Sequence, residues 1–586
     1  MTVKRLRHIT DCIALRTRSK IKKLKNTNNV WVSATKTHNY MLNDGICDWL
    51  KLYCKSNTNT SHIKIKHEKK FTNFIMARGN EFEKEVIKYL KSKFTCIKVA
   101  DFYTLSDADR TLEFMKKGVP IIYSAPIYNR YNKTYGIIDL LVRSDYINKI
   151  FNTNTLTRPE TRIKAPYLNG NYHYRVIDIK YSTLNLSSDG IHLLNSGRNP
   201  AYKSQLYIYN QAVSHLQGFD CDCAYIMGRR WKYTKKNKSF SGDRCDDRLA
   251  SVNFSNYDHS FVHKSNDAID WYRSVVKEGL NWTVYPPSNV NLYPNMCVDS
   301  NNWNSMKSKI AKNIGEITML WNCGIKNRMK AFHKGIYSWK DPKCNSEILG
   351  FKKDTQSSII LDNMININRD SDELILPRKI EDRFWLEDNT YDMYVDFETF
   401  NDVCMNLKDI PKQKPYNIIY MIGVGFKKHN TWSYKSFICN NTSKREEKRI
   451  LKEFYTFYKS FNKPNVYYWS AEKSLWNKSC NYHSYNKSIK WIDMCDIFKQ
   501  ESIVLKGCFG FGLKEISRTM KDHNMINTQL ESECTNGMMA MIKAFNCYEN
   551  VNNPSTSPIM KDIEKYNEYD CKALFDIMNF LREKYN

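Results

Sequence analysis

The hydrophobic and polar positions of the chain follow helical and strand periods in two stretches, residues 71–232 and residues 386–586. In the first stretch, "RGNEFEKEVIKYL" predicts a helix with Phe82, Val86 and Leu90 on one stripe, whereas "YGIIDLLVRSD" and "YRVIDIKYS" predict strands. In the second, "NIIYMIGVGF" predicts a strand, "KREEKRILKEFYTFYKSF" an amphipathic helix and "IEKYNEYDCKALFDIMNFL" a long helix. This alternation predicts a multi-domain α/β protein.

The remaining residues precede and separate these two stretches. Residues 1–70 combine a basic arm with a helical stretch, and residues 233–385 connect the predicted domains. The connection begins with the polar run "YTKKNKSFSGDRCDD", which predicts an exposed loop or linker, and it continues with a helical stretch from about Trp303 to Lys334. Within it, "LWNCGIKNRMKAFHKGI" indicates either a helical hairpin that offers backbone N–H groups to a DNA phosphate or a spacer with a solvated basic face.

Two acids interrupt an apolar strand at the start of the second stretch. In "TYDMYVDFETFND", residues 390–402, Asp396 and Glu398 are two positions apart, so their side chains project to the same side of a strand. Like charges in this arrangement repel, and burying either one costs free energy. The spacing therefore indicates either a solvated face or a cation between the two carboxylates.

Further acids follow in the same stretch. Glu472 lies in "NVYYWSAEKSLW", Asp493 lies in "KWIDMCDIF", and Tyr566 and Asp570 are one helical turn apart near the C-terminus. Four acids can hold two divalent ions that stabilise the attacking and leaving oxygens of a phosphodiester. Either Glu472 or Asp493 is the candidate for the acid between the first and last pairs.

The first stretch holds a second set of candidate ligands. Glu83 lies beside the apolar stripe of its helix, Asp139 lies inside one predicted strand, and Asp178 and Lys180 lie two apart on the next. Each acid alone is consistent with a strand end or a solvated face. Together they supply what metal-dependent phosphodiester hydrolysis requires, because carboxylates hold Mg²⁺ and a lysine positions or activates the water.

Bulk composition narrows the class of function. A net charge of +29 and a pI of about 9.3 are typical of a protein that meets a polyanion such as nucleic acid, although an AT-rich genome also enriches lysine. The 18 cysteines are scattered and there is no secretory signal, which predicts reduced thiols, with Cys221 and Cys223 as core residues rather than metal ligands. No apolar run is long enough for a membrane span. We expect an intracellular protein, in the cytoplasm or nucleus of a host cell, that is not secreted.

The motifs of the first stretch resemble the RecB-type branch of the PD-(D/E)XK nucleases. "RGNEFE", "GIIDLL" and "VIDIK" are similar in order to that family's first, central and D-x-K motifs. The resemblance implies a restriction-endonuclease-like core over residues 71–232. It also implies that Glu83, Asp139 and Asp178 bind Mg²⁺ or Mn²⁺ and that Lys180 activates or orients water.

A helix in "YKSQLYIYNQAVSHL" extends this resemblance. "QLYIY" resembles the Q-x-x-x-Y helix of the family, which implies that Gln205 and Tyr209 support the site or contact DNA. Some relatives carry an iron–sulfur cluster on four cysteines. The cysteine cluster that would follow this helix is absent from the sequence, so no iron–sulfur cluster is expected.

The second stretch, residues 386–586, resembles the DEDD exonucleases of the RNase H-like fold, and more closely the RNase H-like domain that follows RecB-type nucleases in a family of predicted nucleases. The resemblance implies that Asp396 and Glu398 form the first motif, that Glu472 takes the second, and that Tyr566 and Asp570 form the last. The metal ligands would be Asp396, Glu398 and Asp570, and Tyr566 would orient the attacking water.

These resemblances imply a metal-dependent DNA nuclease, exonucleolytic, with a RecB-like main site and a second DEDD-type 3′–5′ exonuclease-like site. The alternatives are a nucleic-acid-binding scaffold with one or both folds inactive, and activity on RNA or an RNA–DNA hybrid. No Walker A motif is present, so a helicase would be a separate partner. The composition fits a large DNA virus or an AT-rich microbe, with a role in DNA repair or recombination. The oligomeric state does not follow from the sequence.

Overall fold

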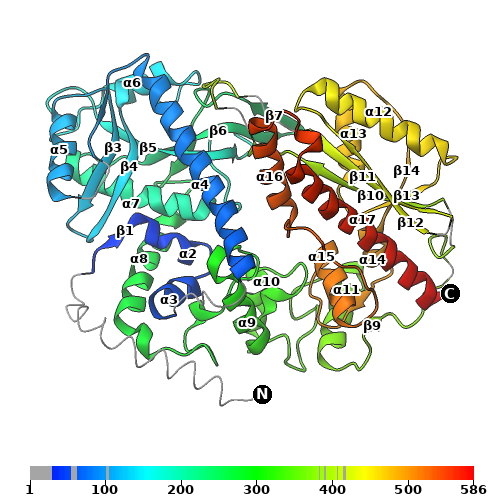
Figure 1. Cartoon of the computed structure of the whole chain (residues 1–586). Helices are drawn as coiled ribbons and strands as arrows, with labels where there is room; N and C mark the ends of the chain where they lie inside the picture. Colours follow the sequence, from blue (N-terminus) through cyan, green and yellow to red (C-terminus); the bar gives the residue numbers. More distant parts are fainter. Residues whose placement is uncertain are drawn as a thin grey trace. The chain divides into compact units, whose positions relative to one another are not determined.

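The computed structural model describes most of the chain, in two compact units that we treat separately (Figure 1). The described residues are 30–54, 62–100, 104–381, 383–387, 391–404, 407–413, 418–429 and 431–586, without the side chains of 62–72. The basic arm predicted at the N-terminus lies outside them. The first unit comprises residues up to His62, Thr72–Ala311 and Asn406–Lys414, and the second comprises Ile63–Phe71, Lys312–Met405 and Pro415–Asn586. One of the passages between the units, from Ala311 to Lys312, falls inside residues 233–385.

The first unit is built on a mixed sheet. Its strands are β1 (Val32–Ser33), β2 (Cys96–Lys98), β3 (Ile121–Asn129), β4 (Thr134–Arg143), β5 (Tyr174–Asn185), β6 (Cys223–Lys235), β7 (Lys238–Gly242) and β8 (Ala250–Asn253). They are ordered β2-β3-β4-β5-β6-β7, with β1 beside β4 and β8 beside β6. The pairs β2–β3, β5–β6 and β1–β4 are parallel and the other pairs are antiparallel. Strands β4 and β5 confirm the predicted strands around Asp139 and Asp178.

Helices cover both faces of this sheet. The α-helices between residues 38 and 278 are α2 (His38–Met41), α3 (Ile46–Tyr53), α4 (His62–Lys91), α5 (Leu105–Lys116), α6 (Ser144–Ile150), α7 (Asn199–Gln217) and α8 (Ser260–Glu278). The predicted stripe of Phe82, Val86 and Leu90 packs in one core cluster with Leu140 and Ile177, which confirms the helix. Residues of α7 join a second cluster with other residues of β4 and β5. Both faces of these strands are therefore buried, which explains their nearly continuous apolar sequence.

Two predictions for the connecting region are wrong. The polar run after residue 232 forms the β6–β7 hairpin, not a loop or linker: its two-residue turn, Lys236–Asn237, has φ angles of 46° and 62°, as a tight hairpin requires. The long helical stretch from Trp303 to Lys334 is divided into α9 (Asn304–Ile314) and α10 (Ile325–His333). Gly315 has a φ of 67° and no room for a Cβ against Ser338, so the helix ends before it.

The cysteines that the structure describes are free thiols, as predicted. Cys221 is buried, and Cys223 is half-buried against an apolar cluster, consistent with core residues. Within the described residues, every helix is too short or too polar to cross a lipid bilayer.

The second unit contains a five-stranded sheet in the order β12-β11-β10-β13-β14. The strands are β10 (Met393–Thr399), β11 (Ile419–Lys428), β12 (Thr431–Ile438), β13 (Asn465–Tyr468) and β14 (Lys490–Asp493). The central strand β10 is antiparallel to β11 and parallel to β13. A separate short ribbon pairs β9 (Ile375–Leu376) with β15 (Val504–Leu505).

The long helices α12 (Lys444–Ser460) and α17 (Pro558–Tyr585) lie on opposite faces of this sheet (Figure 1). The helices of the unit are α10, α11 (Gln356–Arg369), α12 (Lys444–Ser460), α13 (Glu472–Tyr482), α14 (Met494–Gln500), α15 (Leu513–Asp522), α16 (Gly537–Asn550) and α17 (Pro558–Tyr585). Val395 and Phe397 of β10 pack in one core cluster with Phe454 of α12. Tyr394, at the alternate position, contacts Phe575 of α17. Asp396 and Glu398 share that alternation, so they face α17 rather than open solvent.

Candidate functional site

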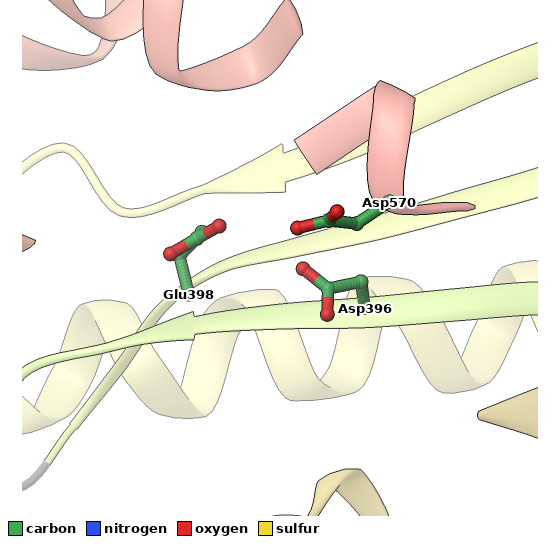
Figure 2. A group of neighbouring side chains, drawn as sticks. All are labelled: Asp396, Glu398 and Asp570. Carbon is green, nitrogen blue, oxygen red and sulfur yellow. The ribbon is translucent and has the colours of Figure 1, made fainter. Parts of the chain in front are cut away.

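Three carboxylates that are far apart in the sequence meet beside strand β10 (Figure 2). Asp396 and Glu398 come from β10, and Asp570 comes from α17, which covers that face of the sheet. One carboxylate oxygen from each residue lies within 4.8 Å of the others. Glu398 and Asp570 are buried and Asp396 is half-buried. This set of oxygen ligands is suited to a hard divalent cation such as Mg²⁺ or Mn²⁺.

The three carboxylates resist being charged together. Burial raises the pKa of Glu398 to about 8, and the negative charge of Asp570 adds to the effect. Burial and then the charges of Asp570 and Glu398 hold the pKa of Asp396 well above its usual value. Burial also raises the pKa of Asp570, against the opposing charge of Lys514. A bound cation would remove this penalty, because it stabilises the ionised form of every carboxylate around it.

One oxygen of the cluster fits a metal ligand particularly well. Asp570 Oδ1 is buried and has no hydrogen-bond partner among the described residues. The other oxygen, Oδ2, lies 3.3 Å from Nζ of Lys514. A buried carboxylate oxygen without a partner is costly, and coordination to a cation would satisfy it. The residues present therefore fit a divalent metal.

Asn567 fixes the orientation of Asp396. Its Nδ2 donates hydrogen bonds to Oδ2 of Asp396 at 2.7 Å and to the backbone carbonyl of the same residue at 3.2 Å. Its own Oδ1 accepts a hydrogen bond from the hydroxyl of Tyr434 at 2.9 Å. Gly423 lies opposite Asp396 in β11, and a Cβ there would overlap Asn567 Oδ1. Only glycine leaves room for this amide.

Tyr566 and Lys514 complete one side of the cluster. Tyr566 is buried one helical turn before Asp570, and the Lys514 ammonium donates a hydrogen bond to its hydroxyl. The same ammonium lies 3.5 Å from the centroid of the Tyr566 ring. Lys514 is the second residue of α15, after Gly512 at the N-cap. Burial, together with the charges of Asp570, Glu398 and Asp396, raises the pKa of Tyr566, so its hydroxyl keeps its proton at neutral pH.

Sequence reasoning did not single out Lys514 or Asn567. A lysine near the start of an amphipathic helix, as in "FGLKEISRTM", has the pattern of a solvated residue. Asn567 lies between Tyr566 and Asp570, and its spacing from Asp570 places it on a nearby face of α17. That adjacency to the Y-x-x-x-D pair is a local signal from which Asn567 could have been proposed.

The structure distinguishes the two candidates for the remaining acid. Glu472 is buried at the first position of α13, and its charge acts on both Asp396 and Glu398. Burial raises the pKa of Glu472 to about 8, although the backbone N–H groups at the start of α13 oppose the shift. Asp493 instead accepts hydrogen bonds from the backbone N–H groups of Ser470 at 3.0 Å and Cys495 at 2.9 Å, and it caps α14. Of the two acids, Glu472 is therefore the one whose charge acts on the pKa values of Asp396 and Glu398.

The acids and lysine predicted in the first unit also converge. Asp178 is buried, and its Oδ2 lies 2.5 Å from Nζ of Lys180. Asp139 Oδ2 accepts a hydrogen bond from the backbone N–H of Ile179 at 2.7 Å, which ties β4 to β5 between the two site positions. Oδ1 of Asp178 is buried without a hydrogen-bond partner among the described residues.

Their charges act on one another. Burial and then the charge of Asp178 hold the pKa of Asp139 well above its usual value. Burial raises the pKa of Glu83, against the charge of Lys180. The pKa of Lys180 lies above its usual value, because attraction to Asp178 and Asp139 outweighs the effect of burial. Within the described residues, however, the acids whose candidate ligand atoms all lie within 4.8 Å of one another are Asp396, Glu398 and Asp570 of the second unit. The acids of the first unit that the structure describes do not meet this spacing.

The predicted Q-x-x-x-Y pair lies on α7. Gln205 Nε2 donates a hydrogen bond to the Tyr209 hydroxyl at 3.0 Å, and Tyr209 is buried. Its ring lies on Gly136 of β4, where a Cβ would overlap the ring. Gly136 is three residues before Asp139, so Tyr209 packs α7 against the strand that carries this acid. Lys180 points toward the same helix, with Nζ 5.3 Å from the ring centroid of Tyr202.

Comparison with known proteins supports part of the expected organisation. Residues 409–582 match a family model described as the RNase H superfamily. No curated protein and no solved structure matches the chain. The matched residues include Glu472, Lys514 and Asp570, and they begin shortly after β10, which carries Asp396 and Glu398. The chain therefore has a C-terminal RNase H-like domain, of a kind associated with metal-dependent nucleases and nucleic-acid substrates.

Proposed function

We propose that this protein is a Mg²⁺- or Mn²⁺-dependent nuclease that hydrolyses DNA phosphodiester bonds, as a 3′–5′ exonuclease, at the Asp396–Glu398–Asp570 cluster. The observation that carries the proposal is the meeting of three carboxylates from β10 and α17 within 4.8 Å, with raised pKa values that a cation would relieve. The match of residues 409–582 to the RNase H superfamily supports the same chemistry.

The residues around the cluster have separable roles in this proposal. Asp396, Glu398 and Asp570 would hold the metal, which when bound polarises the phosphate and lowers the pKa of water. Tyr566 keeps its hydroxyl proton and donates a hydrogen bond that orients the attacking water. Lys514 is held beside Tyr566 and Asp570, where its charge offsets negative charge that develops on the phosphate.

The direct test is degradation of 5′-labelled DNA with Mg²⁺ or Mn²⁺. In a chain that also carries Asp178→Ala, which silences the candidate site of the first unit, we expect Asp570→Asn and Glu398→Gln each to reduce degradation by at least about a hundredfold, since each removes a charge that the metal requires. Asp496→Asn is the matched control, because Asp496 is an exposed carboxylate of the same unit. Activity of Asp570→Asn equal to that of the wild type would remove the proposed site.

A second candidate site lies in the first unit. Glu83, Asp139 and Asp178 with Lys180 would form the RecB-like PD-(D/E)XK site that the motif order predicts. The 2.5 Å contact between Lys180 Nζ and Asp178 Oδ2, and the unpartnered Oδ1 of Asp178, favour this assignment. The ammonium would hold or orient water beside the metal.

The two sites can be separated by paired variants. We expect Asp178→Ala and Asp570→Asn each to remove part of the nuclease activity and the double variant to remove all of it. The residual rate of each single variant then identifies the main site. The second site would be rejected if Asp178→Ala leaves the activity unchanged both in the wild type and in the Asp570→Asn variant.

The same acid chemistry can cut RNA or an RNA–DNA hybrid, so the substrate is tested directly. We expect DNA to be degraded faster than a hybrid or RNA of the same sequence. Faster cleavage of the hybrid would replace the DNA assignment with an RNase H-like activity. Binding that persists in EDTA without cleavage of any substrate would instead identify a nucleic-acid-binding scaffold. A helicase that supplies the strand would be a separate protein.

A further inference from the structure

The β6–β7 hairpin of the first unit carries a dense positive charge that the proposed nuclease sites do not use. Residues 229–242, "RRWKYTKKNKSFSG", contain no aspartate or glutamate. The exposed cations are Lys232, Lys235, Lys236 and Lys238, whereas Arg229 is buried and Arg230 forms an ion pair with Asp243. Residues 234–241 are all exposed, so the hairpin extends into solvent. A polyanion is the natural ligand of such a segment.

One face of the hairpin is a ladder of stacked aromatic rings. Tyr233 and Phe240 are opposite each other in the two strands, with ring centroids 4.9 Å apart and ring planes at 13°. Trp231 stacks on Tyr233 at 5.8 Å, and the Arg248 guanidinium covers Trp231 at 4.2 Å. Phe240 is 40% exposed at the outer end of the ladder. Its ring is therefore available to a further flat group, such as a nucleobase.

The same face ends in two lysines placed directly opposite each other. Lys235 pairs with Lys238 across the strands, and strand alternation places both on the side of Tyr233 and Phe240. Like charges in opposed positions destabilise a hairpin unless an anion lies between them. Among the described residues, neither lysine forms an ion pair with a carboxylate. A nucleotide would suit both the opposed lysines and the exposed ring, because it carries a phosphate for the lysines and a flat base for the ring.

The hairpin is continuous with the acid–lysine cluster of the first unit. Lys180 of β5 pairs with Gly228 of β6, and β6 then runs five residues further to Tyr233. At the rise of a β-strand this is roughly 17 Å. A nucleic-acid strand held on the ladder can thus extend along the same sheet toward Lys180.

We propose that the β6–β7 hairpin binds the single-stranded part of a DNA substrate, with a base stacked on Phe240 and phosphates between Lys235 and Lys238. The assignment of DNA rests on the proposed function, whereas the binding itself does not require turnover. A single strand is favoured over a duplex because its bases are free to stack on an exposed ring, whereas paired bases are not.

The test is binding of fluorescein-labelled oligo(dT) to the full chain in EDTA, measured by anisotropy across a range of salt concentrations. The variants are Phe240→Ala and the pair Lys235→Ser with Lys238→Ser. The charge-matched control is Lys116→Ser with Lys164→Ser, because these lysines are exposed elsewhere in the same unit. Circular dichroism and the thermal midpoint confirm that each variant is folded.

We expect Phe240→Ala to weaken binding of the single strand about tenfold, as loss of one stacked base does. We expect the hairpin lysine pair to reduce the slope of log affinity against log salt by about 1.4, which corresponds to two phosphate contacts. The control pair should leave both quantities unchanged. The affinity for duplex DNA should change less than twofold in Phe240→Ala.

Four outcomes would overturn the proposal. The first two are wild-type affinity for oligo(dT) in both hairpin variants, and a loss of affinity in the control lysine pair as large as that in the hairpin lysine pair. The other two concern the hairpin variants: an equal loss of affinity for duplex and single-stranded DNA, and a larger loss of affinity for oligo(U) than for oligo(dT). The last would assign the hairpin to RNA. Because binding is measured in EDTA with every acid intact, it can succeed even if the chain cleaves no DNA. Conversely, cleavage that depends on Asp570 would stand even if the hairpin does not bind DNA.

Discussion

Asn567 of α17 holds Asp396 of β10 in place by donating hydrogen bonds from one amide nitrogen to both the carboxylate and the backbone carbonyl of that residue. The contact joins the helix that supplies Asp570 to the strand that supplies Asp396 and Glu398. It therefore couples the geometry of the acidic cluster to the packing of α17 against the sheet, and it depends on the missing side chain of Gly423.

Loss of this amide should weaken the cluster without removing a charge. We expect Asn567→Ala to lower metal affinity or nuclease activity about 10–100-fold, the usual effect of removing a group that orients a ligand. Titration of activity with Mn²⁺ measures the change. A positioning role predicts that high Mn²⁺ restores much of the activity, whereas it would not restore Asp570→Asn. Full activity at low Mn²⁺ would contradict the role.

Gly423→Ala tests the same contact from the other side. The new Cβ would overlap Asn567 Oδ1, so α17 or the amide must move, at a cost of about 1–3 kcal/mol in unfolding free energy. Gly79→Ala is the control for the added methyl group, since Gly79 lies inside helix α4 and a Cβ there has nothing within 4 Å. Chemical denaturation measures both. Equal stability of the two variants would show that a side chain at position 423 does not press on Asn567 Oδ1.

The metal-free protein should lose stability as the pH rises. Burial raises the pKa of Glu398 to about 8 from a usual value near 4.5, so the folded state holds a proton that the unfolded state releases. The associated stability is fully present below about pH 4.5 and is lost as the pH approaches 8. In EDTA we expect the unfolding free energy of the second unit to fall by at least about 1 kcal/mol between pH 5 and pH 8.

Divalent metal should reverse this trend, since it binds the ionised carboxylates and binding releases protons. Thermal unfolding at pH 8 with Mn²⁺ should occur at a higher temperature than in EDTA, and Glu398→Gln should flatten the pH dependence in EDTA. The contrary result would be a metal-free protein that becomes more stable from pH 5 to pH 8, with this increase lost in Glu398→Gln. It would show that the pKa of Glu398 is not raised in the folded protein.

Lys514 should shift the pH dependence of the reaction. Its charge lowers the pKa of Asp570, so Lys514→Met should raise that pKa and move the acid limb of the pH–rate profile to higher pH. We also expect a fall in kcat of about a hundredfold if the ammonium stabilises developing charge. An unchanged profile with an unchanged kcat would make Lys514 a packing residue on the Tyr566 ring.

Glu472 and Asp493 should give opposite results. Glu472→Gln removes the charge coupled to Asp396 and Glu398, and we expect activity to fall at least about tenfold with little change in stability. Asp493→Ala removes the cap of α14 and should cost about 0.5–2 kcal/mol of stability, with activity retained. Activity lost in Asp493→Ala but kept in Glu472→Gln would exchange the two assignments.

The fold elements around the candidate sites were largely predictable because their signals are local. The apolar stripe of Phe82, Val86 and Leu90 identified α4, and the runs around Asp139 and Asp178 identified β4 and β5. The division of residues 303–334 was not predicted: helical periodicity continues across Gly315, and only the contact with Ser338 shows that no Cβ fits there. The β6–β7 hairpin was missed because a lysine-rich run has the composition of a loop.

The sequence by itself determined that Asp396 and Glu398 lie on one side of a strand and that Tyr566 and Asp570 lie on one face of a helix, since both follow from backbone periodicity. Only the tertiary structure decided that these two faces oppose each other. It also decided that the charge of Glu472 acts on Asp396 and Glu398, and that Lys514 and Asn567 form hydrogen bonds beside the cluster. The reason is physical: periodicity specifies the direction of a side chain, whereas its partner depends on strand order and helix packing between residues far apart in the chain.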